Sequence, residues 1–313
     1  MSVSFAPMEG ITGYVYRNAF HRCFGGVTKY YTPFLSPGPE IGLPKRAVRD
    51  VLPENNRGVP VVPQLLTRRA EDFLEACVFF KDLGYREVNL NLGCPSGTVV
   101  AKGKGSGFLS DPDALKDFFD AVFRGLPEGI TLTVKTRIGR WSPDEFPALL
   151  EIFNGFPIAE LIVHPRIQKE FYRGEVHRDV FLHAVEKSRI PLTFNGDLFT
   201  VEDILAVRRD FPSVGCVMLG RGLLADPFLA EDYGAAFRGQ ADDAGRKKRI
   251  GAFHDLLIRG YLESFGDEHA VLCRMKELWS YLGESFPGEE RTLKTMKKAK
   301  KLGEFLDAAA GLF

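Results

Sequence analysis

One cysteine stands where a largely apolar stretch of the sequence breaks off. Residues 88–92 are followed at once by Gly93, Cys94 and Pro95. Pro95 has no N–H and a fixed φ, so a β-strand cannot continue through it. The thiol is therefore predicted at the carboxyl end of a buried strand, where α/β barrels carry catalytic groups and where a thiol can be a nucleophile, a general acid or a metal ligand. A small core residue is the other interpretation, but this break and the glycine-rich loop 103–107 favour a functional thiol.

Polar side chains also stand at the ends of other predicted strands. Each one alone is compatible with an ordinary loop residue, but six such ends on one face of a barrel indicate a site. These residues are Gln64, Asn91, Lys135, Arg137, His164, Arg166, Asn195, Asp197 and Arg221.

The last two strand ends carry glycines beside a cationic side chain. Gly196 follows the seventh predicted strand, and Gly220 and Gly222 flank Arg221 after the eighth. In α/β barrels, glycine-rich loops at these two positions let backbone N–H groups approach phosphate oxygens, and an arginine adds a fork of donors. We therefore expect a phosphorylated ligand or cofactor.

Lys135 is predicted to point into the barrel mouth, because the alternation of its strand turns Leu132 and Val134 toward the helices. A buried lysine needs an anionic partner or loses its proton. Beside a phosphate-anchored cofactor, the two candidates are a Schiff base with an aldehyde cofactor and an ion pair with a reduced flavin. Cys94 favours the flavin, since reduction of a conjugated C=C bond needs an acid on the other side of the double bond.

Short β-branched runs alternate with longer amphipathic stretches. Asp111, Ser142 and Thr200 are candidate N-caps of three helices. Pro63 makes the third strand the least regular, and residues 45–58 show no clear helix. Eight strands alternating with helices predict an α/β fold, a (β/α)8 TIM barrel. The expected strands are 3–6, 27–31, 61–64, 87–92, 131–136, 161–164, 192–194 and 215–219, and the helices include 69–83, 112–123, 143–153, 178–186 and 201–210.

The pattern changes after Phe237. Residues 239–245 are small and polar, which is typical of a linker, and residues 246–312 show only helical periodicity. We predict a catalytic barrel domain over residues 1–240 and an all-α domain of three or four helices over residues 241–313.

The composition is that of a soluble globular protein. The chain has 313 residues, of which 45% are hydrophobic and 26% charged, and its net charge is zero. Its five cysteines form no Cys-x-x-Cys pair, so we expect neither a disulfide framework nor a metal site, and a reducing compartment. Without a signal-like amino terminus or an apolar run of about 18 residues, we expect a cytoplasmic protein that does not span a membrane. We also expect a monomer.

Positive charge is concentrated near the end of the chain. Six cations and no acid lie within residues 291–301, and a second basic cluster occupies residues 246–249. On one continuous helix, Lys294, Lys298 and Lys301 would share a face. A solvated helix face is the ordinary explanation. In a chain without net charge, such clustering favours contacts with nucleic-acid phosphates, which give affinity without reading sequence.

Together these residues resemble the tRNA-dihydrouridine synthase family. A weaker similarity to the family, Arg274-Met275-Lys276, lies in the predicted helical domain. Over residues 3–240 the resemblance is carried, in the family's order, by segments 6–12, 91–96 with Lys102, 105–107, 134–139, 163–166, 195–198 and 218–222.

The resemblance implies an FMN-dependent enzyme that reduces the C5=C6 bond of uridine in tRNA, with NADPH or NADH re-reducing the flavin. Cys94 would be the general acid that protonates C5, in keeping with a reference thiol pKa of about 8.5. Lys135 would stabilise the anionic reduced flavin. The expected FMN-binding residues are Pro7, Met8, Gln64, Lys135, His164, Asn195, Gly196, Asp197, Gly220 and Arg221. The expected tRNA-binding residues are Asn91, Lys102, Arg166, Arg274 and Lys276, together with Lys294, Lys298 and Lys301 from the charge pattern.

Two other functions stay open on the sequence. A flavin barrel acting on a free pyrimidine, similar to dihydroorotate or dihydropyrimidine dehydrogenases, would need no basic helical domain. A flavin-containing RNA-binding protein without turnover would need neither Cys94 nor Lys135. No Gly-x-Gly-x-x-Gly motif follows a predicted strand, so the preference between NADPH and NADH stays open. Tyr14, Thr32-Pro33 and Pro165 depart from the family pattern, which leaves the substrate subclass and the modified tRNA position open.

Overall fold

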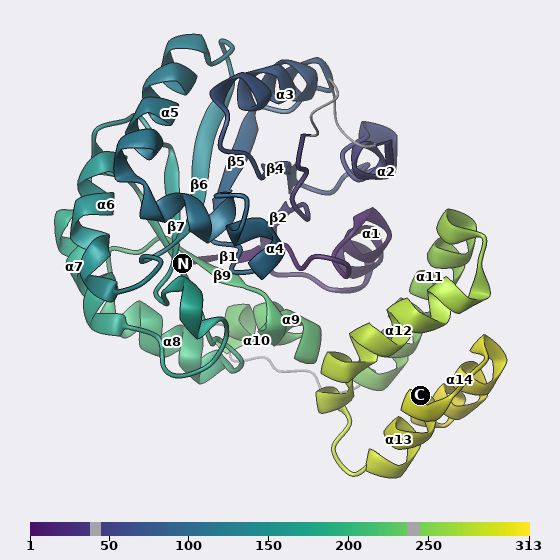
Figure 1. The fold of residues 1–313 in the computed structure, drawn as a ribbon. Helices are drawn as coiled ribbons and strands as arrows, with labels where there is room; N and C mark the ends of the chain where they lie inside the picture. Colours follow the sequence, from purple (N-terminus) through teal and green to yellow (C-terminus); the bar gives the residue numbers. More distant parts are fainter. Residues whose placement is uncertain (38–44, 237–244) are drawn as a thin grey trace.

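Nine parallel strands surround one axis in the computed structural model, which describes residues 1–37, 45–236 and 245–313 (Figure 1). Within these residues the strand order is β3-β2-β1-β9-β8-β7-β6-β5-β4. The predicted TIM-barrel class is confirmed. The strands are β1 (Ser2–Phe5), β2 (Val27–Tyr31), β3 (Val61–Val62), β4 (Gln64–Leu65), β5 (Glu87–Leu92), β6 (Thr131–Arg137), β7 (Glu160–His164), β8 (Leu192–Asn195) and β9 (Cys216–Leu219).

The predicted third strand is two short strands separated by Pro63. β3 pairs with β2, whereas β4 pairs with β5. Pro63 lacks the N–H that a ladder needs, but its carbonyl accepts a hydrogen bond of 2.9 Å from the Asn89 N–H. One interrupted segment therefore joins the first and last strands of the sheet, and nine strands fill the eight positions that the sequence predicts.

Helices cover the outside of the barrel in the order expected for βα units. Two predicted caps are present, since the Asp111 side chain accepts from the Ala114 N–H and the Thr200 side chain from the Asp203 N–H. Ser142 instead caps a 3-10 turn, Pro143–Glu145, so that helix begins later than predicted. The outer helices are α1 (Tyr14–Cys23), α3 (Ala70–Asp82), α5 (Pro112–Gly125), α6 (Phe146–Asn154), α7 (Arg178–Lys187), α8 (Val201–Asp210) and α10 (Leu229–Ala236), and shorter helices are α4 (Gly97–Val100) and α9 (Arg221–Ala225).

The expectation of irregular structure over residues 45–58 was wrong in part. This segment contains a short helix, α2 (Lys45–Arg49), and a 3-10 turn, Pro53–Asn55. It is held by a distant side chain, because the buried Arg17 donates to the Asp50 carbonyl (2.6 Å) and to Asn56 Oδ1 (2.8 Å). Elements this short depend on tertiary contacts and leave little periodicity in the sequence.

The alternation along β6 decides which residues reach the inner face of the barrel. Leu132 and Val134 are buried in the large apolar cluster beneath the helices. Thr133 points the other way, where its hydroxyl meets Asn89 Nδ2 at 2.9 Å. Lys135 shares that inner face and lines the pocket at the barrel mouth, as predicted.

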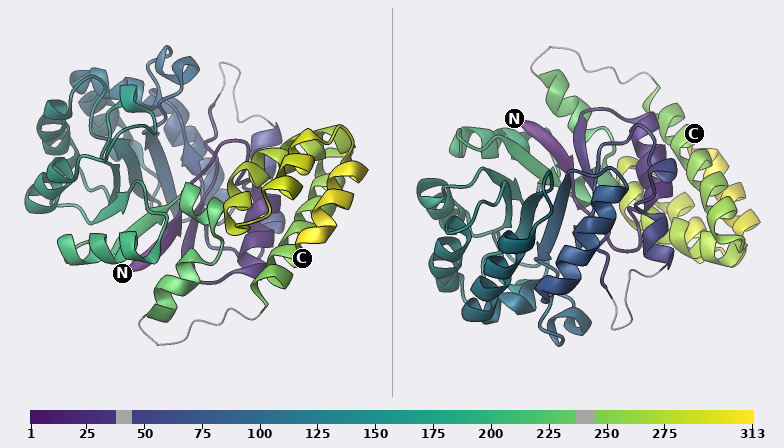
Figure 2. Two further views of the ribbon diagram at one scale, coloured as in Figure 1. Left: turned by 90° about the horizontal axis from the view of Figure 1, so that it is seen from below. Right: turned by 90° about the horizontal axis from the view of Figure 1, so that it is seen from above.

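Four α-helices follow the barrel, in agreement with the three or four predicted: α11 (Arg246–Phe265), α12 (Glu268–Leu282), α13 (Glu290–Lys298) and α14 (Leu302–Ala309). They lie on one side of the barrel, where α11 packs against α1 (Figure 2). Phe253 of α11 packs edge-on against Tyr16 and Phe20 of α1, at centroid distances of 5.4 and 6.1 Å. Most of the predicted linker 239–245 lies outside the described residues. No helix in the described ranges is both long and apolar enough to cross a lipid bilayer.

The basic stretch 291–301 is not one helix, which corrects the sequence interpretation. α13 ends at Lys298, and Ala299 takes an extended backbone conformation. Lys301 precedes α14, whose first turn is capped when Glu304 Oε2 accepts from the Lys300 N–H at 2.8 Å. Lys294 and Lys298 are therefore exposed on one helix, and Lys301 is exposed on the next connection.

Candidate active site

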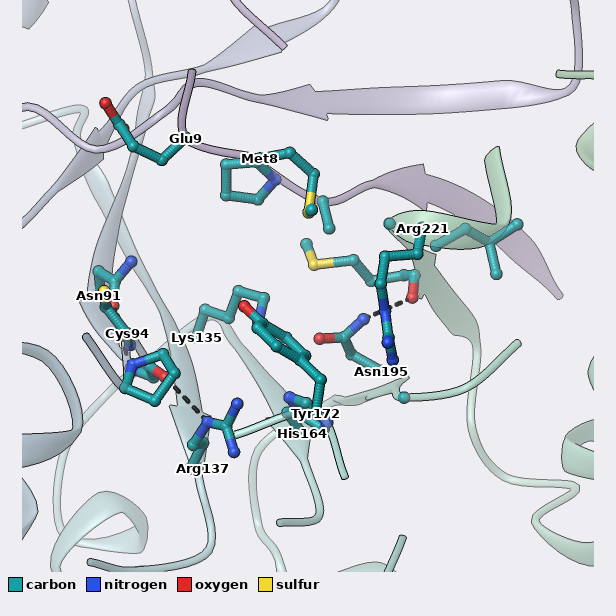
Figure 3. A pocket seen from close by; sticks show the side chains of 18 of the residues that line it. Met8, Glu9, Asn91, Cys94, Lys135, Arg137, His164, Tyr172, Asn195 and Arg221 are labelled. Carbon is teal, nitrogen blue, oxygen red and sulfur yellow. Dashed lines mark hydrogen bonds between the residues drawn. The ribbon is translucent and has the colours of Figure 1, made fainter. Parts of the chain in front are cut away.

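A pocket opens at the carboxyl ends of the strands and brings the predicted residues together. Cys94 and Glu9 lie on one side and Asn195 and Arg221 on the other, with Lys135 between them (Figure 3). Twelve residues predicted from the sequence line this pocket: Pro7, Met8, Gln64, Asn91, Cys94, Lys135, His164, Asn195, Gly196, Asp197, Gly220 and Arg221.

The loop that carries Cys94 is held by its own strand end. Asn91 Oδ1 accepts from the backbone N–H groups of Gly93 (3.0 Å) and Cys94 (2.9 Å). The Cys94 carbonyl accepts from the Ser106 hydroxyl at 2.8 Å. Arg137 Nε donates to the Gly93 carbonyl at 3.0 Å. The thiol therefore projects into the pocket from a rigid loop.

The glycine-rich loop after α4 has a packing role. Gly105 has a φ of +57°, and a Cβ on it would lie 2.8 Å from the Cys94 carbonyl oxygen. A Cβ on Gly107 would lie 2.8 Å from the Val100 carbonyl oxygen. Only glycine allows this close approach. The glycine-rich loop therefore packs directly against the backbone of Cys94 and holds it in place.

The surroundings of Cys94 keep its thiol protonated. Burial raises the pKa of Cys94, and the carboxylate of Glu9 acts in the same direction. The hydrogen bond from the Ser96 backbone and the charges of Lys135 and Arg137 oppose this without reversing it. At neutral pH the group is therefore a proton donor, and it has less thiolate character than an activated nucleophilic cysteine.

The Lys135 amine has no acidic partner among the described residues. It makes no hydrogen bond or ion pair with any of the described residues and lines the pocket. Burial, together with the nearby charge of Arg137, lowers the pKa of Lys135 to about 7. An anion bound beside it would restore its charge, so the pocket is built to receive negative charge there.

His164 lines the pocket, and Arg166 lies behind it. Burial, reinforced by the neighbouring cations, lowers the pKa of His164 well below its usual value, so the ring is neutral. Its Nε2 lies 3.3 Å from Arg166 Nη1, so a neutral ring with this nitrogen unprotonated accepts from the guanidinium. The ring of Tyr172 stacks on His164 at a centroid distance of 6.1 Å.

Asp197, which lines the pocket, pairs with two arginines. Its carboxylate pairs with Arg166, and its Oδ1 accepts from Arg221 Nη2 at 2.7 Å. Burial tends to raise the pKa of Asp197, but the hydrogen bonds and charges of the two arginines outweigh it and lower the pKa. Asp197 has a φ of +46°, a left-handed conformation that aspartate tolerates better than most residues. Its carboxylate therefore holds Arg221 toward the pocket.

Arg166, predicted to contact the substrate, lies behind the pocket wall. It is fully buried and is not among the lining residues. Its guanidinium is shared among Asp197, His164 and the Gly174 carbonyl. The structure places it where it orients the residues that reach the pocket.

Gln64 and Asn91 belong to a chain of amides inside the barrel. Asn91 Nδ2 donates to Gln64 Oε1 at 2.7 Å, and Gln64 Nε2 donates to Asn89 Oδ1 at 2.8 Å. The hydroxyl of Thr32, one of the unusual positions in the sequence, accepts from the Gln64 N–H at 3.0 Å. Both predicted site residues are thus held at the pocket floor by neighbouring strands.

Several pocket residues were not assigned a role from the sequence. Tyr172 and Phe199 line the mouth, and Arg221 lies over both rings at 4.9 and 5.3 Å. Glu9 also lines the pocket, and so does Arg137, which the sequence identified only as a strand-end residue. The sequence signal that could have identified Tyr172 and Phe199 was the presence of aromatic residues in the loops after the sixth and seventh predicted strands.

The other predicted tRNA-binding residues lie outside this pocket. Lys102 is exposed near the cysteine loop. Arg274 of α12 lines a second cavity, between the barrel and the helices, that shares Glu9 and Pro33 with the pocket. Lys276 donates to the Ala299 carbonyl and so closes the end of α13.

Part of the basic cluster 246–249 has a structural role, which limits the sequence interpretation. Arg246 pairs with Asp232 at 2.5 Å. Arg249 pairs with Glu231 at 2.6 Å and donates to the Cys23 carbonyl. These contacts attach α11 to α10 and α1, and leave the exposed Lys247 and Lys248 facing solvent.

Comparison with known proteins relates this site to one family. The chain matches the family model described as dihydrouridine synthase over residues 4–311. It is 30% identical over 301 residues to the tRNA-dihydrouridine(16) synthase of Pseudomonas putida, with 92% of this chain and 90% of that protein aligned. It is 28% identical over 311 residues to the Ralstonia nicotianae protein of the same name, with 96% and 93% aligned. A probable tRNA-dihydrouridine synthase of Staphylococcus epidermidis is 30% identical over 236 residues, with 72% and 70% aligned.

Proposed function

Because the chain belongs to the dihydrouridine synthase family, we propose that it uses FMN to reduce uridine to dihydrouridine in tRNA, with NADPH or NADH re-reducing the flavin. One observation carries the proposal: a protonated thiol, Cys94, shares a pocket with the amine of Lys135, which has no acidic partner among the described residues. The first supplies a proton, and the second favours negative charge on a bound group.

The pocket residues fit a flavin mononucleotide. Arg221, held by Asp197, stands beside Gly220, where the first turn of α9 leaves backbone N–H groups without helical partners. These groups would hold the single phosphate. Lys135, Gln64, His164, Met8 and the backbone near Pro7 would surround the ring system. Asn195 is oriented by its Nδ2, which donates to the Met218 carbonyl at 2.8 Å.

Bound FMN would supply a hydride to C6 of the uracil. Cys94 donates its thiol proton to C5, so that one hydride and one proton complete the reduction of the C5=C6 bond. An anionic form of the bound group would favour the charged form of Lys135, and that charge would in turn favour the anionic form. Asn91 keeps the thiol in place through two backbone contacts.

The helical region offers the surface for the rest of the tRNA. Lys294, Lys297 and Lys298 are exposed on α13, and Lys300 and Lys301 follow them. The family match continues through this region to residue 311, which favours an RNA substrate over a free pyrimidine. Both the Pseudomonas putida and the Ralstonia nicotianae relatives are named for position 16, so we propose uridine 16 as the first position to map.

The direct test is reduction of an unmodified tRNA transcript by the purified protein with FMN and NADPH. We expect dihydrouridine at one mapped position of the tRNA. We expect no reduction of free uracil and no formation of dihydroorotate. Turnover of a free pyrimidine but not of tRNA would support the alternative enzyme. Tight tRNA binding without any product would support the non-catalytic alternative.

Replacing Arg221 with alanine is expected to weaken FMN binding by about 1–3 kcal/mol, the usual cost of losing a charge-assisted hydrogen bond. Titration of flavin-free protein, followed by quenching of FMN fluorescence, measures this change. Arg221→Lys keeps the charge but loses the fork, so it should show an intermediate loss. Lys247→Ala, an exposed cation on α11, is the control. Unchanged FMN affinity in Arg221→Ala would remove Arg221 from the phosphate site.

Replacing Lys294, Lys298 and Lys301 together with glutamine is expected to weaken tRNA binding and its salt dependence. Each lost phosphate contact lowers the slope of log K against log salt by roughly 0.7–0.9, so the triple change should lower it by about two to three. Flavin reduction by NADPH should not change, because the pocket is untouched. Replacing Lys116 and Lys187, exposed on α5 and α7 across the barrel, with glutamine shows the effect of removing two surface charges away from this region (Figure 1). An unchanged slope in the triple variant would show that this basic surface is only solvated.

A further inference from the structure

Exposed aromatic side chains occur in the loops that follow the strands on the pocket side of the barrel, and two of them, Tyr172 and Phe199, line the pocket. Among the described residues, seven large hydrophobic side chains are classed as exposed, and four of these are aromatic residues in the loops after β6, β7 and β8. Trp141 is 52% exposed, and Tyr172, which lines the pocket, is 48% exposed. Large exposed apolar groups on one face are typical of a binding surface.

Trp141 stands apart from the hydrophobic core and is flanked by two cations. Arg140 Cζ and Lys169 Nζ each lie 4.3 Å from the centroid of its ring. The backbone beneath it is fixed, because Glu145 accepts from the N–H groups of Arg140 (2.8 Å) and Trp141 (2.7 Å). The indole is therefore presented to solvent by a rigid loop.

The two cations differ in freedom. Arg140 Nη1 donates to the Ser110 hydroxyl at 2.9 Å, which anchors its guanidinium. Lys169 is exposed, lies three residues before Tyr172, and contacts the indole through a long flexible side chain. It can leave the ring without breaking a hydrogen bond to another described residue. A planar group can thus replace the ammonium on the indole while the ammonium meets an adjacent anion.

We propose that Trp141, with Arg140 and Lys169, binds an unpaired nucleotide of the tRNA next to the target uridine. The base stacks on the indole, and Lys169 moves to the phosphate of that nucleotide. Stacking accepts any base, and the cations favour the charged backbone. This inference rests on the proposed function and adds a second contact region to it.

The position of Trp141 supports this occupant. The loop after β6 belongs to the side of the barrel that carries α6 and α7, whereas α11–α14 lie across the barrel (Figure 1). The Gln168 N–H donates to the Gly139 carbonyl at 3.0 Å, which ties the Trp141 loop to the loop that carries Tyr172. An RNA strand that places a base in the pocket would therefore be held by the basic helices on one side and by Trp141 on the other.

The test uses Trp141→Ala and Trp141→Phe, with Leu182→Ala as the matched control. Leu182 lies on the outer helix α7 and is 44% exposed. We expect Trp141→Ala to weaken tRNA binding by about 5- to 150-fold, the range for loss of one stacked base. Trp141→Phe should retain most of the affinity because its ring still stacks, and Leu182→Ala should bind as the unaltered protein does.

The chain has two tryptophans, which gives a direct optical readout. Trp279 is 6% exposed, so tRNA should quench mainly the emission of Trp141. This quenching should disappear in Trp141→Phe while tRNA still binds. Unchanged affinity in Trp141→Ala, equal losses in the alanine and phenylalanine variants, or quenching that persists in Trp141→Phe would each overturn the inference. Absence of dihydrouridine formation by the unaltered protein would instead overturn the proposed function.

Discussion

Replacing Cys94 with alanine is expected to lower the rate of dihydrouridine formation by about 10²–10⁴-fold, the usual contribution of a general acid. FMN binding and flavin reduction by NADPH should persist, because the thiol proton is needed only at C5 of the uracil. Single-turnover measurements that follow flavin reduction and flavin reoxidation by tRNA separately would show the loss in the second step alone.

Two further measurements sharpen this prediction. Cys273→Ala removes an exposed thiol from the helical region and should leave both steps unchanged. Since burial raises the pKa of Cys94, the acid stays protonated through neutral pH and its contribution is lost as pH rises through that raised pKa. Normal tRNA-dependent reoxidation in Cys94→Ala would refute its role as the acid.

Replacing Asp197 with alanine is expected to destabilise the fold and weaken FMN binding together. Arg166 is fully buried, and loss of its carboxylate partner leaves an uncompensated charge, a change that typically costs 3–5 kcal/mol. Because Asp197 is 33% exposed and the Gly174 carbonyl still accepts from Arg166, we expect the lower end, about 3 kcal/mol. Arg221 also loses the partner that orients it. Urea unfolding measures the free energy, and flavin titration the affinity.

The loss of stability caused by Asp197→Ala depends on pH in a defined direction. The folded-state pKa of Asp197 is lowered, so its contribution is present above the unfolded pKa of about 3.9 and is lost as pH falls through the folded pKa. The difference between the two proteins should therefore be full at pH 7 and shrink in acid. Asp210→Ala, which removes a surface partner of Arg178, should leave stability nearly unchanged. Equal stability of Asp197→Ala and the unaltered protein at pH 7 would show that the arginines do not depend on this carboxylate.

The convergence of the site could be predicted from local patterns. Parallel strands all end on the same face of a barrel, so the residues that follow each strand, such as Asn91, Lys135 and Asn195, must meet there. The Gly93-Cys94-Pro95 break marked the thiol for the same reason. The alternation of side chains along the strand was also sufficient to predict that Lys135 points into the barrel and Val134 toward the outer helices.

What each charged side chain contacts depended on the tertiary structure. Arg166 and Arg249 read as cations available to RNA, yet Asp197 and Glu231 accept from them at positions 31 and 18 residues away. Arg17 holds the segment around α2 from a different element. Such pairings follow from how elements pack, and nothing in the local sequence specifies them.

The break between Lys298 and Lys301 lies between these cases. Glu304, three residues after Lys301, is a local helix-start signal. The contact at the end of α13 comes from another helix, because Lys276 of α12 donates to the Ala299 carbonyl. The sequence alone determined the barrel, the face that carries the pocket and the position of the thiol, because these follow from periodicity and from where strands stop. Only the tertiary structure decided which cationic side chains reach the pocket and which are held in ion pairs elsewhere, because an ion pair depends on two side chains that folding brings together.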